Sequence, residues 1–131
     1  MKTIQRITIL FCCLLTIACQ AQNNKFESLS NEEFKKIITD PNIILIDVRT
    51  ADEFQGGHIP QALNIDVRSP QFDSLISKLD KKKSVAVYCR SGGRSKSAAK
   101  KITEKGFKVY ELNKGVMNWQ EPLVKSSTEK E

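Results

Sequence analysis

The sequence predicts an α/β fold in which a mostly parallel central sheet is covered by helices on both faces. Short apolar runs alternate with amphipathic stretches, which is the pattern of strands connected by crossover helices. The runs at residues 43–46 and 85–88 are continuously apolar, as expected of strands buried on both faces. Because ligands bind beyond the carboxyl ends of the strands in such sheets, the residues that follow these runs are candidates for function.

Capping and turn residues set the first elements. Residues 26–29 are expected to form a short edge strand. Ser30 and Glu33 have the spacing of a capping box, which starts a helix. This helix runs to about Thr39, since Asp40-Pro41-Asn42 then turns the chain.

Strand and helix alternate through the middle of the chain. We expect a strand at 43–48, followed by one helical turn at 51–55 that Gly56-Gly57 ends. A short strand at 62–65 then precedes a helix at 70–79, whose apolar side chains recur at helical spacing.

The last elements follow the second buried run. A strand at 85–88 leads into a helix at 94–105, and Gly106 lies just past the end of this helix, where a glycine commonly stops one. Residues 107–112 alternate in polarity and fit a strand. A short helix at 115–119 follows.

The N-terminal segment has the features of an export signal. Lys2 and Arg6 precede an apolar run that ends at Ala18, which gives the basic n-region and the apolar h-region of a secretory signal. The small Ala18 directly before Cys19 resembles a bacterial lipoprotein signal, in which the cysteine is lipidated and becomes the mature N-terminus. Thr16 lies three residues before Cys19, where such signals usually have leucine. The alternative is an uncleaved membrane anchor.

These features divide the chain into four parts. We expect a signal peptide at 1–18, a tether at 19–25 that begins with lipidated Cys19, a folded domain at 26–124 and a polar tail at 125–131. The protein is then exported and held by its lipid on a bacterial membrane, facing the periplasm.

The use of cysteine singles out one thiol. Cys12 and Cys13 leave with the signal, and Cys19 carries the lipid, so only Cys89 remains free. No intrachain disulfide is then possible. A single thiol outside the cytoplasm is a liability unless it is used, which favours a functional role for Cys89.

Charge and composition argue against two classes of ligand. The net charge is +6, but the basic residues are dispersed and no aromatic residues are interleaved with them, so we do not expect nucleic-acid binding. His58 is the only histidine, and no second type of ligand lies near it in the sequence. We therefore expect no metal site, and we interpret His58 as a packed turn residue.

Cys89 begins a loop whose chemistry favours an ionised thiol. The loop reads Cys89-Arg90-Ser91-Gly92-Gly93-Arg94-Ser95. Its two glycines permit backbone angles closed to other residues, and inward-pointing N–H groups in such a loop form an anion-binding nest. The helix that follows adds its positive end. We therefore expect Cys89 to be a thiolate with an oxyanion bound beside it.

The other loop residues are the candidates for holding that oxyanion. Arg90 and Arg94 supply positive charge, or face solvent. Ser91 and Ser95 donate hydrogen bonds to the bound species, or cap the helix.

Asp47 and Arg49 follow the first buried run and are interpreted as supporting structure. A buried carboxylate needs partners, so Asp47 is expected to accept hydrogen bonds from nearby backbone. Arg49 is expected to pair with Glu53 or another acid.

Four segments together resemble one known family, the rhodanese sulfurtransferases. They are the cysteine loop at 89–95, Ile46-Asp47-Val48-Arg49, Gly57-His58-Ile59-Pro60 with the residues that follow to Ile65, and 112–119. The resemblance covers residues 26–124 and implies a rhodanese-like domain. Gln61 and Lys114 depart from it, since each replaces a glycine of the family pattern.

The resemblance implies a sulfurtransferase that works through a persulfide on Cys89. The thiolate takes the outer sulfur of a small sulfur-containing anion such as thiosulfate, or of a persulfide donor, and passes it to a thiol, a protein acceptor or cyanide. Electrostatic stabilisation by the loop requires no metal and no organic cofactor.

Two alternatives stay open. The domain is a non-catalytic module that carries persulfide sulfur for a protein partner, or a cysteine phosphatase or arsenate reductase of the same fold. Phosphatases of this fold place five residues between cysteine and arginine, whereas four separate Cys89 from Arg94, so the spacing disfavours the last alternative.

Overall fold

The sheet has five strands in the order β1-β5-β4-β2-β3, and all four strand pairs are parallel. The structure, a computed structural model, describes residues 25–126. Its elements are β1 (Glu27–Leu29), α1 (Asn31–Ile37), β2 (Ile43–Asp47), α2 (Ala51–Gly56), β3 (Leu63–Asn64), α3 (Phe72–Ser77), β4 (Ser84–Tyr88), α4 (Gly93–Glu104), β5 (Val109–Leu112) and a 3-10 turn η1 (Val116–Asn118). The predicted α/β class with a parallel sheet is therefore confirmed.

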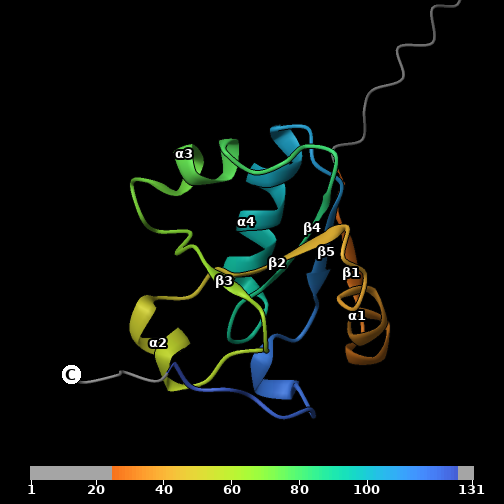
Figure 1. Ribbon diagram of the computed structural model, residues 1–131, viewed down its shortest axis with the longest axis vertical. Helices are drawn as coiled ribbons and strands as arrows, with labels where there is room; N and C mark the ends of the chain where they lie inside the picture. The colour runs from red at the N-terminus through yellow and green to blue at the C-terminus, as the bar shows by residue number, and fades with distance from the viewer. Residues whose placement is uncertain (1–24, 127–131) are drawn as a thin grey trace, which may run out of the picture.

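The two continuously apolar runs form the centre of the sheet. β2 and β4 pair from Ile43 opposite Ser84 to Asp47 opposite Tyr88. Both faces of β2 and β4 are therefore covered, and an apolar cluster forms on each face of the sheet. One cluster joins β2, β4 and β5 to α3 and α4. The other packs against α1 and η1. Figure 1 shows α4 and α1 on opposite sides of the strands.

Helix boundaries differ from prediction where capping differs. Ser30 accepts a hydrogen bond from the Glu33 N–H at 3.3 Å, which is one half of the predicted capping box. The complete box, with reciprocal bonds, lies instead at Thr50 and Glu53 and starts α2. Helix α3 is shorter than the predicted 70–79, because Ser69 Oγ accepts from the Gln71 N–H in a turn that precedes the helix.

One of the two departures from the family pattern strains the backbone. Gln61 has φ 71°, and it is the only residue other than glycine with positive φ within residues 25–126. A side chain in the left-handed region costs about 1–2 kcal/mol relative to ordinary backbone. Lys114 has negative φ, so the lysine at that position carries no such cost.

The carboxyl ends of the strands gather the segments that matter for function. The chain after β4, the short helix α2 and the turn η1 all lie toward the lower edge of the view in Figure 1. This is the edge at which parallel sheets of this kind hold their ligands.

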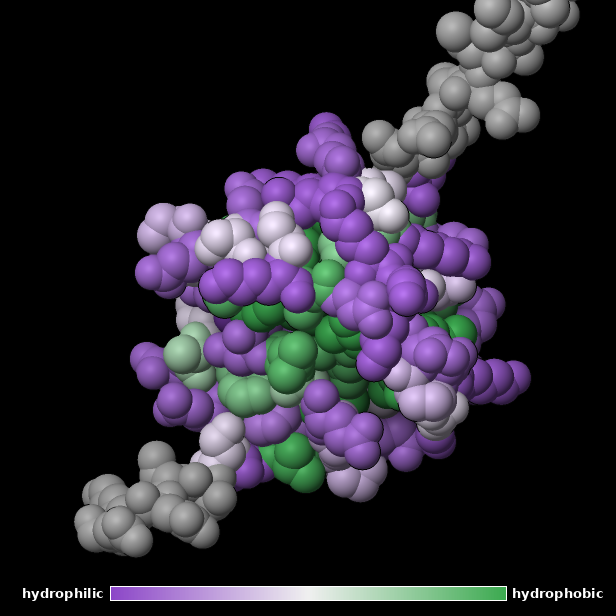
Figure 2. Space-filling view, turned by 45° about the horizontal axis from the view of Figure 1, so that its top comes forward, coloured by the Kyte–Doolittle hydropathy of each residue, from purple (hydrophilic) through white to green (hydrophobic). Residues whose placement is uncertain are grey.

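Polar side chains cover most of the face shown in Figure 2, with apolar groups visible between them near its middle. Among residues 25–126 no helix has the length and apolar character needed to span a bilayer. The expected signal peptide and Cys19 lie outside the described residues, and so does most of the expected polar tail.

Candidate functional site

Cys89 is the first residue after β4, and its side chain is nearly inaccessible. Strand alternation puts it on the same face as Val87, within the cluster that α4 covers. The residue is 1% exposed. It is the only cysteine among the described residues, and it is not in a disulfide. A reagent must therefore pass the loop to reach the sulfur.

Hydrogen bonds from the loop favour the charged form of the thiol. The Gly92 N–H donates to Sγ of Cys89 at 3.1 Å, and Oγ of Ser95 lies 3.4 Å from Sγ. Burial raises the pKa of Cys89, but contacts with the Ser95 side chain and with the backbone N–H groups of Ser95, Gly92 and Ser91 outweigh it, so the pKa is lowered. The amides therefore point inward, as the sequence predicts.

Two glycines fix the loop against the turn that follows β5. Gly92 has φ 110°, and a Cβ on it would lie 2.3 Å from the carbonyl oxygen of Asn113. Gly115 has φ 70°, and a Cβ there would lie 2.3 Å from the carbonyl oxygen of Arg90. The N–H groups of Val116 and Met117 donate to the carbonyls of Cys89 and Arg90. The loop therefore has a rigid support.

The two arginines of the loop have different surroundings. Arg94 is held by Glu53 of α2 through hydrogen bonds of 2.7 and 2.9 Å. The bond to Arg94 is the main reason why the pKa of Glu53 falls from 4.5 to about 2. The charge of Cys89 is among the groups that raise the pKa of Arg94. Arg90 is exposed, and so are Ser91 and Gly93.

Asp47 and Arg49 form a buried ion pair at the carboxyl end of β2. Arg49 donates to Asp47 through Nε and Nη2 and to the carbonyl of Gly57. Asp47 also accepts from the Arg49 backbone N–H, as expected of a buried carboxylate. The sequence predicts that Arg49 pairs with Glu53 or another acid, and the partner is the other acid, Asp47, because the carboxylate of Glu53 is bound to Arg94. The Arg49 guanidinium lies 5.8 Å from the centroid of the Tyr88 ring, and burial raises the pKa of Tyr88.

His58 is a packed turn residue in the structure. Its ring stacks on Phe54 with the centroids 3.7 Å apart, and its Nδ1 lies 2.9 Å from the Phe54 carbonyl. Within residues 25–126, no cluster of three or more His, Cys, Asp or Glu side chains forms a candidate metal site.

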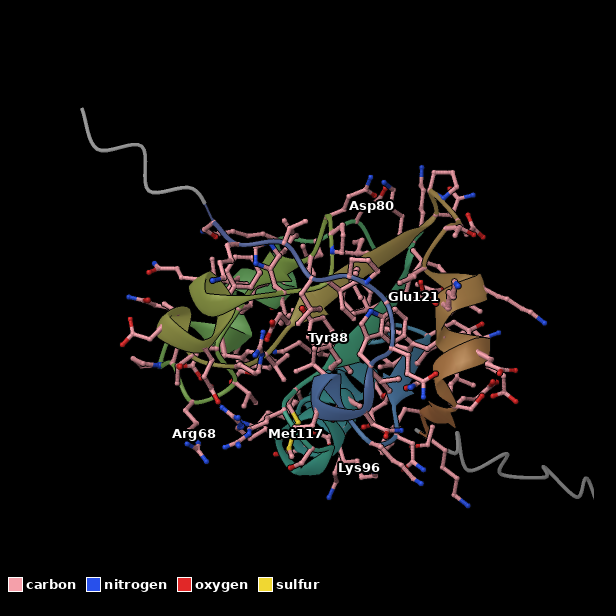
Figure 3. The ribbon with its side chains drawn as sticks, turned by 90° about the horizontal axis from the view of Figure 1, so that it is seen from below. Arg68, Asp80, Tyr88, Lys96, Met117 and Glu121 are labelled. Atoms are coloured by element: carbon pink, nitrogen blue, oxygen red, sulfur yellow. The ribbon has the colours of Figure 1, made fainter. Side chains whose placement is uncertain are left out.

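Sequence reasoning does not single out a second cluster, which lies behind the loop. Glu111 of β5 is buried and accepts hydrogen bonds from Ser95, Lys96 and Ser28. A carboxylate in an alternating strand reads as solvent-facing, so no local pattern could have revealed it. Figure 3 views the molecule from below and labels Lys96 of α4, one of the three donors to Glu111.

A cationic hollow adjoins the first turn of α4. Its volume is about 560 Å³, and the charged residues that line it are Arg94, Arg68, Lys101 and Asp73. The hollow offers positive charge to an approaching anion. Lys101 lies seven residues after Arg94 on the same face of α4, whereas Arg68 is distant in sequence and only the fold brings it to Arg94.

Comparison with known proteins gives a consistent result. Residues 30–122 match the family described as a rhodanese-like domain. A thiosulfate sulfurtransferase GlpE of Coxiella burnetii is 35% identical over 96 residues, which cover 72% of this chain and 88% of that protein.

Two further similarities concern a longer protein and a solved structure. A tRNA uridine(34) hydroxylase of Legionella pneumophila is 36% identical over 107 residues, which are 76% of this chain but only 41% of that protein. The chain thus matches about two-fifths of such hydroxylases. A rhodanese-related protein of Thermoplasma volcanium superposes with a TM-score of 0.68 over 76% of this chain and 98% of that one, at 24% identity, which bears on the fold alone.

Proposed function

The chain belongs to the rhodanese-like domain family, and from this premise we propose that it is a sulfurtransferase in which Cys89 carries the transferred sulfur. The observation that carries the proposal is a hydrogen bond at the N-terminus of α4. The N–H of Gly92 donates to Sγ of Cys89, with 3.1 Å between nitrogen and sulfur. Hydrogen bonds to a thiolate stabilise the form that attacks sulfur.

The reaction has two displacement steps. The Cys89 thiolate attacks the outer sulfur of thiosulfate, the sulfur–sulfur bond breaks, and sulfite leaves with the electron pair. An acceptor thiolate or cyanide then attacks the outer sulfur of the persulfide, and Cys89 leaves as the thiolate. Charge is conserved in each step, and no external oxidant or reductant is required. The loop N–H groups stabilise the anionic sulfur in each state.

Thiosulfate is proposed as the donor on two grounds. The related GlpE protein is named for thiosulfate, and the cationic hollow beside Arg94 favours a small anion over a neutral donor. Arg94 itself stays paired with Glu53, so it contributes to the local charge of the hollow and does not act as a free clamp.

The burial of Cys89 favours one alternative, a module that carries persulfide sulfur for a protein partner. Cys89 is 1% exposed, so its sulfur must be uncovered before a bulky acceptor reaches it. A partner that displaces the loop would provide that access. Phosphate chemistry is disfavoured because Arg94, the arginine at the helix end of the loop, is bound to a carboxylate, whereas a phosphatase needs a free guanidinium there for bidentate contact with phosphate.

Mass spectrometry after thiosulfate treatment tests the proposal. We expect the full chain to gain one sulfur atom on Cys89, and the Cys89→Ser variant to gain none. Thiocyanate production from thiosulfate and cyanide then identifies an enzyme, whereas loading without turnover identifies the module. Hydrolysis of an aryl phosphate with no sulfur gain would contradict both.

The location of the protein is a separate proposal. We propose that Cys19 is lipidated and that the domain is held on a membrane by this lipid, on the strength of the basic and apolar segments before Ala18. Metabolic labelling of a bacterial host with a fatty-acid analogue should label the full chain and leave Cys19→Ser unlabelled.

A further inference from the structure

A buried carboxylate is separated from the sulfur of Cys89 by a single side chain, that of Ser95. Glu111 is fully buried in β5, on the face that α4 covers. Its Oε2 lies 2.6 Å from Ser95 Oγ, and Ser95 Oγ lies 3.4 Å from Sγ of Cys89. The three side chains therefore form a continuous chain of contacts that leads from the sulfur into the sheet.

Ser95 cannot satisfy all of its neighbours. A hydroxyl has one proton to donate, and three acceptors surround this one. They are Glu111 Oε2 at 2.6 Å, the Gly92 carbonyl at 3.0 Å and Sγ at 3.4 Å. The shortest contact is with the carboxylate, and hydrogen bonds to charged acceptors are the stronger ones. In this geometry Glu111 is the strongest competitor for the proton, and Sγ of Cys89 receives only part of its hydrogen bonding.

We propose that Glu111 is a positioning residue that competes with the Cys89 thiolate for the Ser95 proton and, by weakening that hydrogen bond, keeps the thiolate reactive. The inference rests on the proposed sulfur transfer and deepens it. Glu111 touches neither donor nor sulfur, so it acts only through Ser95.

The two states of Cys89 respond differently to this competition. The thiolate is a strong acceptor, and a hydrogen bond from Ser95 would stabilise it and slow its attack. In the persulfide, Sγ is bonded to carbon and sulfur, the charge lies on the outer sulfur, and Sγ accepts weakly. The Ser95 proton is then best placed on Glu111. Glu111 therefore favours the loaded form over the empty form, and no net proton transfer is required.

The charges around the pair are few and identified. On the Glu111 side, Lys96 of α4 lies 3.2 Å from Oε1, and Ser28 of the exposed strand β1 donates to Oε1. Val87, opposite Glu111 on β4, carries no charge. On the Cys89 side, Arg94 is the nearby cation, and it is paired with Glu53. Lys96 and Ser28 hold the carboxylate without contacting the sulfur, so they set how strongly it competes for Ser95.

A pH titration of thiolate absorbance tests the inference on the full chain. The Cys89→Ser variant serves as the reference that subtracts the other cysteines. Glu111→Gln places an amide N–H toward Ser95 and frees its proton for Sγ, so the Cys89 midpoint should fall by about one pH unit. In a Ser95→Ala background the same substitution should shift the midpoint by less than half as much.

Simple charge removal predicts another result. Loss of the carboxylate charge alone would shift the midpoint equally in both backgrounds, and this would overturn the inference. So would an unchanged or raised midpoint in Glu111→Gln.

A second variant avoids the buried position. Ser28 is exposed and uncharged, and Ser28→Ala removes one donor from Glu111, which makes the carboxylate a stronger competitor for Ser95. The Cys89 midpoint should rise by about 0.3 unit. If Glu111→Gln fails to fold, this variant decides, and an unchanged midpoint would overturn the inference.

The titration is independent of sulfur transfer. Absence of the shifts in a protein that still gains sulfur from thiosulfate would refute only the role of Glu111. Shifts in a protein that gains no sulfur would refute only the proposed function.

Discussion

The carboxylate of Glu53 holds the guanidinium of Arg94 through two hydrogen bonds, at 2.7 and 2.9 Å, and so connects α2 to the cysteine loop. The same carboxylate closes the capping box with Thr50. Helix α2 is therefore positioned by the loop that it borders, and its stability should follow the charge of Glu53.

The Glu53→Gln variant should show this dependence as a loss of stability that varies with pH. The folded pKa of Glu53 is lowered from 4.5 to about 2. The carboxylate thus stabilises the fold at pH values above about 4.5, and this contribution is lost as the pH falls through 2. Because the side chains of Glu53 and Arg94 are partly exposed, we expect Glu53→Gln to lower the free energy of unfolding by about 1 kcal/mol at neutral pH. Urea unfolding at neutral pH and near pH 2 measures it, and an equal difference at both pH values would contradict the assignment.

Gly92→Ala should disrupt the loop. The residue has φ 110°, and the added Cβ would lie 2.3 Å from the Asn113 carbonyl oxygen, so backbone must move. We expect a loss of about 2–3 kcal/mol in the free energy of unfolding, together with loss of the N–H contact to Sγ and of sulfur uptake.

Gly93→Ala is the matched control for this loop. A Cβ on Gly93 meets nothing within 4 Å, and its φ is not positive. Both stability and sulfur uptake should stay close to those of the unchanged protein. Equal damage from the two alanines in thermal melts and in mass spectra would show that the loop is sensitive for a reason other than the Asn113 contact.

The difference between Gly92 and Gly93 shows which features of the loop can be predicted from the sequence. Two adjacent glycines after an apolar run are enough to predict an open loop, and alternation of apolar and amphipathic stretches is enough to predict the parallel sheet, since both are local patterns. Which glycine approaches the backbone of Asn113 is a property of the packed fold, and no local pattern encodes it.

Charge pairing was the least predictable feature, for the same reason. Arg94 and Glu53 are 41 residues apart, and Glu111 meets Ser95 across two elements. Arg49 has both Asp47 and Glu53 within four residues, and the sequence could not decide between them. The structure assigns Asp47 to Arg49 because both are buried at the end of β2, whereas Glu53 begins α2 and faces Arg94.

Gln61→Gly should stabilise the protein. Gln61 has φ 71°, where a side chain costs about 1–2 kcal/mol. Glycine removes this strain from the folded state, but it also gives the unfolded chain more freedom, which offsets part of the stabilisation. We expect a net increase of about 0.5–1 kcal/mol in the free energy of unfolding. Lys114→Gly is the control, since Lys114 has negative φ and gains no relief. Denaturant midpoints of the two variants should move apart, and a similar rise in both would argue against strain at Gln61.

Ser95→Ala should change the pH profile of sulfur uptake and not merely its size. Contact with the Ser95 side chain helps to lower the pKa of Cys89, so its removal should raise the midpoint of thiolate formation by about 0.5–1 unit. At pH values below both midpoints, less thiolate is present and persulfide formation from thiosulfate should slow severalfold. Above both midpoints the order should reverse or the difference should vanish, because a thiolate of higher pKa is the better nucleophile. The exposed Ser97→Ala on the same helix should leave the profile unchanged. Rates of sulfur gain measured across pH decide the matter: a uniform slowing of Ser95→Ala at every pH would assign Ser95 to the support of the loop alone.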